Sequence, residues 1–72
     1  MTARIQSVLF PIDAFSNYTA KKWLEVHGLT HYKVDVTKRY RRYRQYDPTD
    51  EERYVTKTLP NRIKLILGYA YN

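Results

Sequence analysis

Apolar and polar side chains alternate with a period of two in several parts of this chain, a pattern typical of β-strands with one buried face. Residues 32–37 show it most clearly, because three apolar side chains alternate there with three polar ones. The first predicted strand instead ends in a continuous apolar run, and we expect Val8, Leu9 and Phe10 to be buried. The predicted strands are residues 5–10, 32–37, 38–46, 54–59 and 63–71.

A helical period separates the first two predicted strands. The residues that share one face of this helix are Ala20, Trp23, Leu24 and His27. Thr19 is the expected N-cap, because a hydroxyl oxygen can accept a hydrogen bond from a free N–H of the first turn. Gly28 is the expected C′ residue, where a left-handed backbone costs least. The pattern therefore predicts a helix over residues 20–27.

Together these elements predict one small α+β domain over residues 1–72, with the order β-α-β-β-β. One helix packed on one face of a mostly antiparallel sheet is the simplest architecture for that order. We expect the helix to pack through Trp23 and Leu24. The expected contacts in the sheet are Val8, Val34, Leu65 and Leu67. The opposite face of the sheet would stay open and display tyrosine, arginine and lysine side chains.

Composition narrows the possible classes of protein. The chain has 72 residues, 43% of them apolar and 15% aromatic, which suits a small core and argues against disorder. The absence of cysteine excludes disulfides and cysteine-type zinc sites. No apolar run reaches the ~18 residues that span a membrane, and the run at 8–12 is too short for a signal peptide. We therefore expect an intracellular or intraparticle protein that is not secreted.

The net charge of +6 is concentrated in one segment. From Lys38 to Tyr46, five of nine residues are cationic, three are tyrosine and none is acidic, whereas residues 47–52 hold four acids and no base. Arginine pairs with phosphate, and nucleic-acid bases stack on tyrosine rings or guanidinium planes. Three interpretations stay open: a nucleic-acid contact, a strand whose arginines only cover the sheet while Tyr43 packs in the core, and a contact for an acidic protein.

Alternation along this basic run predicts two faces. Tyr40, Arg42, Arg44 and Tyr46 would share one face, and Arg41, Tyr43 and Gln45 the other. In the nucleic-acid interpretation the cations neutralise phosphates and the rings stack on bases or pack against the sugars. Lys21 and Lys22 oppose the helix dipole, a cost that a bound phosphate would offset, although two solvated lysines are the favoured interpretation. The candidate contact residues are Lys38, Arg39, Tyr40, Arg41, Arg42, Tyr43, Arg44 and Tyr46, together with Lys21, Lys22 and Lys57.

Catalytic and metal chemistry find little support in the sequence. Gly28 interrupts the helix between His27 and His31, so we expect His27 to pack or to cap the helix rather than to bind a metal. The acids at positions 47, 50, 51 and 52 could hold a divalent ion, but a solvated loop followed by the first turn of a short helix is the favoured interpretation. Neither serine has the glycine-rich setting of a nucleophile elbow, and the two glycines form no phosphate loop. We predict no catalytic residue, metal or cofactor.

Short motifs along nearly the whole chain resemble a small module of large DNA viruses and tailed phages. The module is free-standing or appended to virion or DNA-handling proteins. The motifs are Ser-Val-Leu-Phe at 7–10, Tyr-Thr-Ala-Lys-Lys-Trp-Leu at 18–24, His-Gly at 27–28, Val-Asp at 34–35, Tyr40, Tyr-Arg-Gln at 43–45, Asp-Pro at 47–48, Lys-Thr-Leu at 57–59 and Ile-Lys-Leu-Ile-Leu-Gly at 63–68.

The resemblance implies a viral origin, a compact α+β unit and no catalytic residues. The module tends to carry polar or aromatic residues where this chain has Arg39 and Arg41, and a glycine near Asn61. The third predicted strand is therefore unusually basic here, which favours a specialisation toward nucleic acid.

We expect a non-catalytic, viral nucleic-acid-binding domain with little sequence specificity, and DNA rather than RNA as its partner. The alternative is a structural or protein-interaction module, such as a virion component or adaptor, that could form a homodimer through Tyr40 and Tyr46. Neither hypothesis involves a membrane or a small-molecule substrate.

Overall fold

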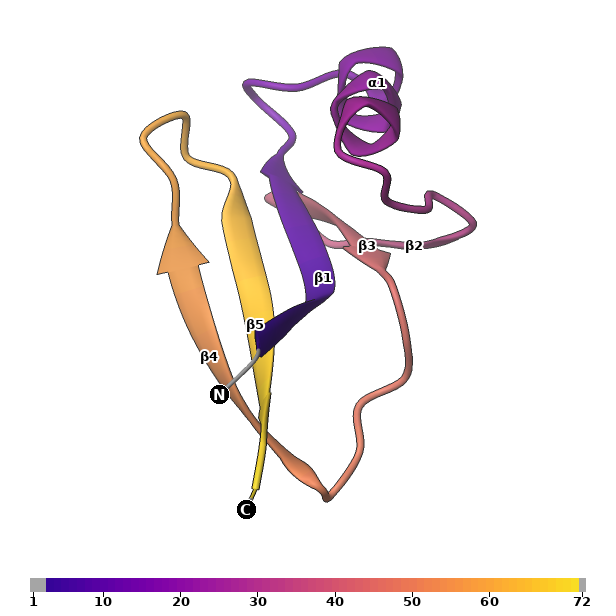
Figure 1. The fold of residues 1–72 in the computed structure, drawn as a ribbon. Coiled ribbons are helices and arrows are strands. Elements are labelled where there is room, and N and C mark those ends of the chain that lie inside the picture. The colour runs from indigo at the N-terminus through magenta and orange to yellow at the C-terminus, as the bar shows by residue number, and fades with distance from the viewer. Residues whose placement is uncertain (1–2, 72) are drawn as a thin grey trace.

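The computed structural model describes residues 3–71, which form one helix and five strands in the predicted order β-α-β-β-β. The elements are β1 (Ala3–Pro11), α1 (Asn17–Val26), β2 (Lys33–Val36), β3 (Tyr40–Arg44), β4 (Glu52–Thr58) and β5 (Lys64–Ala70). The strands form one sheet in the order β2-β3-β1-β5-β4, and every neighbouring pair is antiparallel (Figure 1). The predicted α+β architecture is confirmed.

Strand β1 is the centre of the sheet, and β2 and β4 are its edges. The pairing of β1 with β5 shifts register between Ile5 and Ser7, as it does at a β-bulge. Because of this shift, Ile5 lies opposite Leu67 and shares a face with Val8, which lies opposite Leu65. The bulge thus keeps both ends of β1 apolar on the side of the sheet that faces the helix.

The helix begins three residues earlier than the sequence predicts. Its N-cap is Ser16, whose Oγ accepts a hydrogen bond from the Thr19 N–H at 3.1 Å. Thr19 Oγ1 in turn accepts one from the Ser16 N–H at 2.9 Å, so the two residues form a capping box. The prediction of Thr19 as the N-cap was wrong. Thr19 is the third residue of the helix, and its hydroxyl completes the capping box of Ser16.

The end of the helix follows the predicted signal. Gly28 has φ of 69°, and its N–H donates to the Glu25 carbonyl while the Leu29 N–H donates to the Leu24 carbonyl. This pair of bonds is a Schellman motif. His27 is the C-cap; its ring stacks on Trp23 with centroids 3.8 Å apart, and its Nδ1 lies 2.8 Å from the Trp23 carbonyl oxygen. His27 therefore packs and caps the helix, as the sequence predicts.

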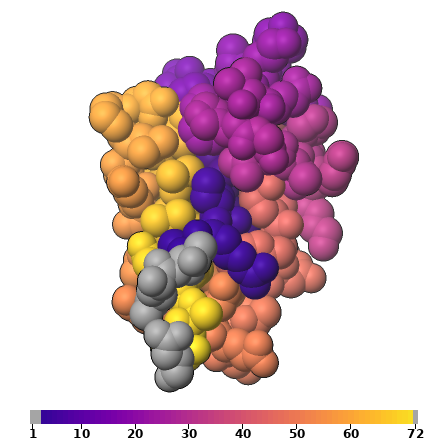
Figure 2. Space-filling view, in the orientation of Figure 1, coloured from indigo at the N-terminus to yellow at the C-terminus, as the bar shows by residue number. Residues whose placement is uncertain are grey.

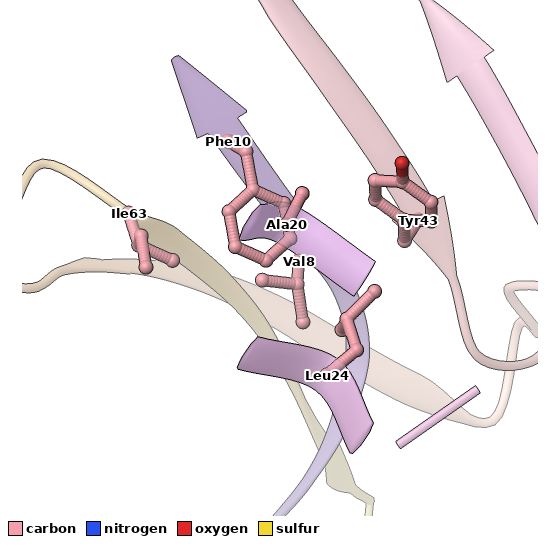
Figure 3. Packing of buried hydrophobic residues seen from close by; sticks show 6 residues of the cluster. All are labelled: Val8, Phe10, Ala20, Leu24, Tyr43 and Ile63. Carbon is pink, nitrogen blue, oxygen red and sulfur yellow. The ribbon is translucent and has the colours of Figure 1, made fainter. Parts of the chain in front are cut away.

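The core lies between the helix and the three inner strands. Figure 3 shows Val8 and Phe10 of β1 between Ile63 on one side and Tyr43 of β3 on the other, near Leu24 and Ala20 of the helix. All six side chains are fully buried. Burial of a side chain the size of leucine or phenylalanine contributes about 2–3 kcal/mol, so these few residues dominate the stability of so small a protein.

Two predicted core positions are wrong. Leu9 is only half-buried, because alternation directs it to the face away from Val8 and Phe10. Val34 is 45% exposed, because it lies on the edge strand β2, and α1 lies toward one end of the sheet (Figure 1). Figure 2 shows the helix and its flanking loops gathered at that end, on a molecule measuring 38 × 21 × 20 Å.

Candidate nucleic-acid interface

The basic run is divided between the two faces of the sheet, as its alternation predicts. Strand β3 pairs with β1 so that Tyr40, Arg42 and Arg44 lie opposite Pro11, Leu9 and Ser7, on the face away from the helix. Arg41 and Tyr43 lie on the helix side. We call the side away from the helix the open face. The eleven candidate contact residues therefore do not form one surface.

Tyr43 is a core residue and is not available to stack on a base. Its side chain is fully buried, and its ring meets Phe10 edge-on with centroids 5.6 Å apart. The hydroxyl donates a hydrogen bond to Asn17 Oδ1 at 3.1 Å, which ties β3 to the first turn of the helix. Burial raises the pKa of this phenol. The proposed contact role is wrong for Tyr43, because its register opposite Val8 places it under the helix.

Arg41 also lies on the helix side. Its Nη1 donates a 2.9 Å hydrogen bond to the carbonyl oxygen of Phe15, just before the helix. This bond satisfies a loop carbonyl and fixes the connection between β1 and α1. Arg41 therefore keeps its charge, but it does not extend a row of cations on the open face.

Arg44 is neutralised by carboxylates of the chain itself. Its Nη2 lies 3.1 Å from Asp35 Oδ2 on the neighbouring strand β2, and its Nη1 lies 3.8 Å from Asp47 Oδ1. Asp47 is shared with Lys33, whose Nζ is 3.6 Å away. A phosphate would have to displace these acids. Arg44 is therefore removed from the candidate contacts.

Arg42 lies on the open face, and its hydrogen-bond partners within residues 3–71 are neutral. Its Nε donates to Ser7 Oγ at 3.2 Å, and its Nη2 donates to Gln6 Oε1 at 3.3 Å. Ser7 and Gln6 are buried polar residues of β1, and the Ser7 hydroxyl donates to Gln6 Oε1 at 2.6 Å. This network holds the guanidinium in one place without cancelling its charge. Arg42 thus remains a fixed positive charge on the open face.

Tyr46 belongs to a separate cluster at the other end of the sheet. The Arg4 guanidinium lies 3.7 Å from the centre of its ring, and its hydroxyl donates to Glu52 Oε1 at 2.8 Å. Glu52 also accepts hydrogen bonds from Arg4 Nε at 3.0 Å and from the Tyr54 hydroxyl at 3.1 Å. These contacts occupy one face and the polar end of the Tyr46 ring, so base stacking by Tyr46 is not supported.

The pKa values of this cluster follow from its contacts. The hydrogen bond from Arg4 lowers the pKa of Glu52, whose side chain is only 8% exposed. Burial, followed by the bond to Glu52, raises the pKa of Tyr46. Glu52 was predicted to lie in a solvated acidic stretch, so this role was missed. Arg4 is 48 residues away in the chain, so no local spacing could reveal the pair.

The cations that remain on or next to the open face gather around Tyr40. Lys38 and Arg39 form the tip of the β2–β3 hairpin, are exposed, and have no ion pair with a carboxylate within residues 3–71. Lys64 Nζ, on β5, lies 5.1 Å from the centre of the half-buried Tyr40 ring. We define the Tyr40 cluster as Lys38, Arg39, Tyr40, Arg42 and Lys64.

A shallow concavity adjoins the Tyr40 cluster. It is lined by Pro11, Ile12, Asp13, Lys38, Arg39, Tyr40 and Arg62. Arg62 is paired with Asp13 at 2.9 Å, so the uncompensated charge at the rim comes from Lys38 and Arg39. Lys64 was not a candidate contact, although alternation along residues 63–67 already directs it away from Ile63 and Leu65. This alternation could have identified Lys64 as a candidate contact from the sequence.

The other predicted contacts lie elsewhere. Lys21 and Lys22 are exposed on α1, which covers the opposite face of the sheet. Lys57 is exposed on the edge strand β4 and lies opposite Leu65, which also places it on the helix side. A ligand bound to the Tyr40 cluster would not contact these three lysines without wrapping around an edge of the sheet.

Residues 3–71 show neither a metal-binding cluster nor a membrane-spanning helix. No group of three or more His, Asp or Glu side chains is placed to hold a metal ion among those residues. The helix within residues 3–71 spans ten residues, too few to cross a membrane.

Comparison with known proteins gave no match among family models, curated proteins or solved structures. The resemblance to a viral module therefore stays a prediction.

Proposed function

We propose that this protein is a non-catalytic nucleic-acid-binding domain that contacts the phosphate backbone through the Tyr40 cluster. The observation that carries the proposal is the uncompensated charge of Lys38, Arg39, Arg42 and Lys64 around one half-buried tyrosine. Each cation can meet a phosphate, and the Tyr40 ring can stack on a base or pack against a sugar. A viral setting, and DNA rather than RNA as the partner, are parts of the same proposal that rest on the sequence.

The proposed surface is smaller than the one predicted from the sequence. Three or four phosphates now face cations, so we expect a log–log salt slope of about −3 on duplex DNA and a shallower slope on single strands. Sequence specificity should be low, because the Tyr40 cluster offers no helix for insertion into the major groove. Affinity should depend strongly on ionic strength and weakly on base composition.

A matched pair of double variants tests where binding occurs. Lys38→Ala/Arg39→Ala removes the hairpin tip, and Lys21→Ala/Lys22→Ala removes the same charge from the helix; both lower the net charge from +6 to +4. Binding of labelled duplex and single-stranded DNA would be followed by fluorescence anisotropy at several salt concentrations. We expect the hairpin-tip variant to flatten the salt slope by about 2, and the helix variant to leave it unchanged.

Two results would overturn the proposal. One is the absence of DNA binding at low salt. The other is an equal loss of affinity in both double variants, because net charge alone would then explain binding.

The homodimer through Tyr40 and Tyr46 that the sequence predicts is not part of this proposal. Tyr46 is held between Arg4 and Glu52, and Tyr40 is flanked by cations that would repel those of a second copy. If this chain associates with itself, another surface is needed.

A further inference from the structure

Strand β2 is an edge strand whose two faces are both exposed. It pairs with β3 alone, and all four of its residues are accessible to solvent. On the helix side, Val34 is 45% exposed and Val36 66%, and Tyr32, in the bend just before the strand, is 84% exposed. A row of exposed apolar side chains along an unpaired edge is the arrangement that favours the addition of another strand.

The hydrogen-bond pattern shows which backbone groups of this edge are free. At the hairpin, the Thr37 N–H donates to the Tyr40 carbonyl at 2.8 Å, so Thr37 and Tyr40 form a hydrogen-bonded pair. Such pairs alternate with non-bonded ones in antiparallel strands, which makes Asp35 and Lys33 the next residues bonded to β3. The N–H and C=O groups of Val34 and Val36 therefore point away from the sheet.

The other edge of the sheet is better protected. On the helix side of β4, Val55 lies between Arg53 and Lys57, and charged residues beside an apolar one discourage pairing with another chain. No such charge interrupts the apolar row on the same side of β2. The two edges thus differ, and β2 is the edge that is less protected against pairing with another strand.

The charges along β2 favour a second copy of this chain as the partner, and they favour one register of pairing. In a two-fold antiparallel pairing centred on Val34, each Val34 lies opposite its copy and uses its outward backbone groups. Lys33 of one copy then lies opposite Asp35 of the other, twice. Both side chains are more than half exposed, and each can share its charge between this contact and its ion pair within the chain, Lys33 with Asp47 and Asp35 with Arg44. A shift by one residue pair in either direction would place Lys33 opposite Lys33 or Asp35 opposite Asp35.

We propose that this protein forms a two-fold dimer by pairing β2 with β2 of a second copy, centred on Val34. Tyr32 of each copy packs beside Val36 of the other, so the exposed apolar row becomes a shared surface. The paired edges join the two sheets into one, with both helices on the same side. Both open faces, each with its Tyr40 cluster, then share the other side of the joined sheet.

The pairing is short, so the dimer is expected to dissociate on dilution. Sedimentation equilibrium of the intact chain, from low to high micromolar concentration, should show the mass rising from the 8.7 kDa monomer toward twice that value. A monomer throughout this range would overturn the proposal.

Charge reversal tests the register. Lys33→Asp places like charges opposite each other twice, and so does Asp35→Lys, so each single variant should remain monomeric. The double variant Lys33→Asp/Asp35→Lys should dimerise again, because its charges are complementary. An equimolar mixture of the two single variants should also associate, since one copy carries two acids and the other two lysines.

The rescue separates the proposed contact from effects within one chain. Each reversal also disturbs an ion pair inside the monomer, Lys33 with Asp47 or Asp35 with Arg44, and circular dichroism would confirm that both single variants remain folded. Association of the mixture can only arise between copies. If the single variants dimerise as well as the wild type, or if the mixture stays monomeric, the β2 interface is wrong. DNA binding by the Tyr40 cluster is measured separately and does not depend on this outcome.

Discussion

Replacing Gly68 with alanine should destabilise the protein, even though the same change in an uncrowded strand stabilises. A Cβ on Gly68 would lie 2.5 Å from Tyr46 Oη, 2.9 Å from Tyr54 Cε1 and 3.0 Å from Glu52 Oε1. Ordinary contact begins at 3.4 Å, so the Tyr46 hydroxyl alone would have to move by about 0.9 Å. Whether Gly68→Ala lowers or raises stability depends on whether the cluster of Tyr46, Tyr54 and Glu52 side chains can move aside.

The contacts of the cluster resist that movement. The Tyr46 hydroxyl is bonded to Glu52 at 2.8 Å, and its ring lies 3.7 Å from the Arg4 guanidinium. Overpacking of this kind costs about 1–3 kcal/mol. Removing glycine's backbone freedom in the unfolded chain returns about 0.5–1 kcal/mol. The net loss should be about 1–2 kcal/mol, which lowers the Tm of so small a domain by about 5–15 °C.

Urea unfolding followed by the fluorescence of Trp23, the single tryptophan, measures this loss. Tyr46→Phe supplies the control, because it removes the closest of the three atoms. In a double-mutant cycle, Gly68→Ala should cost clearly less in the Tyr46→Phe background than in the wild type. If Gly68→Ala is as stable as the wild type, or if its cost is the same in both backgrounds, the reasoning about this cluster is refuted.

Three further predictions concern stability. Arg62 has φ of 72°, so Arg62→Gly should be more stable than Arg62→Ala by about 1 kcal/mol, because both variants lose the ion pair with Asp13 and only glycine relieves the strain; equal urea midpoints would contradict this. Gly28→Ala should cost about 1 kcal/mol from backbone strain alone, since a Cβ there meets nothing within 4 Å, and Gly28→Asn should cost less. The pKa of Glu52 in the folded protein lies below its ordinary value of 4.5. The ionised carboxylate therefore stabilises the fold at pH values above 4.5, and this stabilisation is lost as the pH falls through the folded-state pKa. Urea midpoints from about pH 7 to about pH 3 should therefore fall less steeply for Glu52→Gln than for the wild type.

Local patterns predicted the elements of this fold well. A continuous apolar run located the first strand, alternation located the other four, and Gly28 marked the end of the helix, because all these signals depend on neighbours a few residues apart. The N-terminal boundary of the helix was misplaced, since Ser16 and Thr19 are equally suitable hydroxyl residues and only the backbone shows which one is outside the helix. The burial of Val34 was misjudged for another reason. How far a single helix extends across a five-stranded sheet is a tertiary property.

The candidate site was harder to predict, because a basic sequence is not the same thing as a basic surface. Alternation correctly separated Tyr43 from Tyr40, but it could not show which face the helix covers. The Arg44–Asp35 ion pair crosses a hairpin, and the Arg4–Glu52 pair joins segments far apart in sequence. Glu52 receives its partners from β1, β4 and the β3–β4 loop. Such contacts appear only once the sheet order is known.

The two residues at the tip of the β2–β3 hairpin bear most directly on the proposed function. Thr37 closes this hairpin, because its Oγ1 donates to the Tyr40 carbonyl and accepts from the Tyr40 N–H. Lys38 and Arg39 have negative φ and exposed side chains, so any ordinary residue would satisfy the turn. The fold thus gives no reason for two adjacent cations there, whereas it explains Arg41, Arg42 and Arg44 through their bonds to the chain. For the same reason, alanine at 38 and 39 should leave stability almost unchanged, which makes that pair a clean probe of charge in binding.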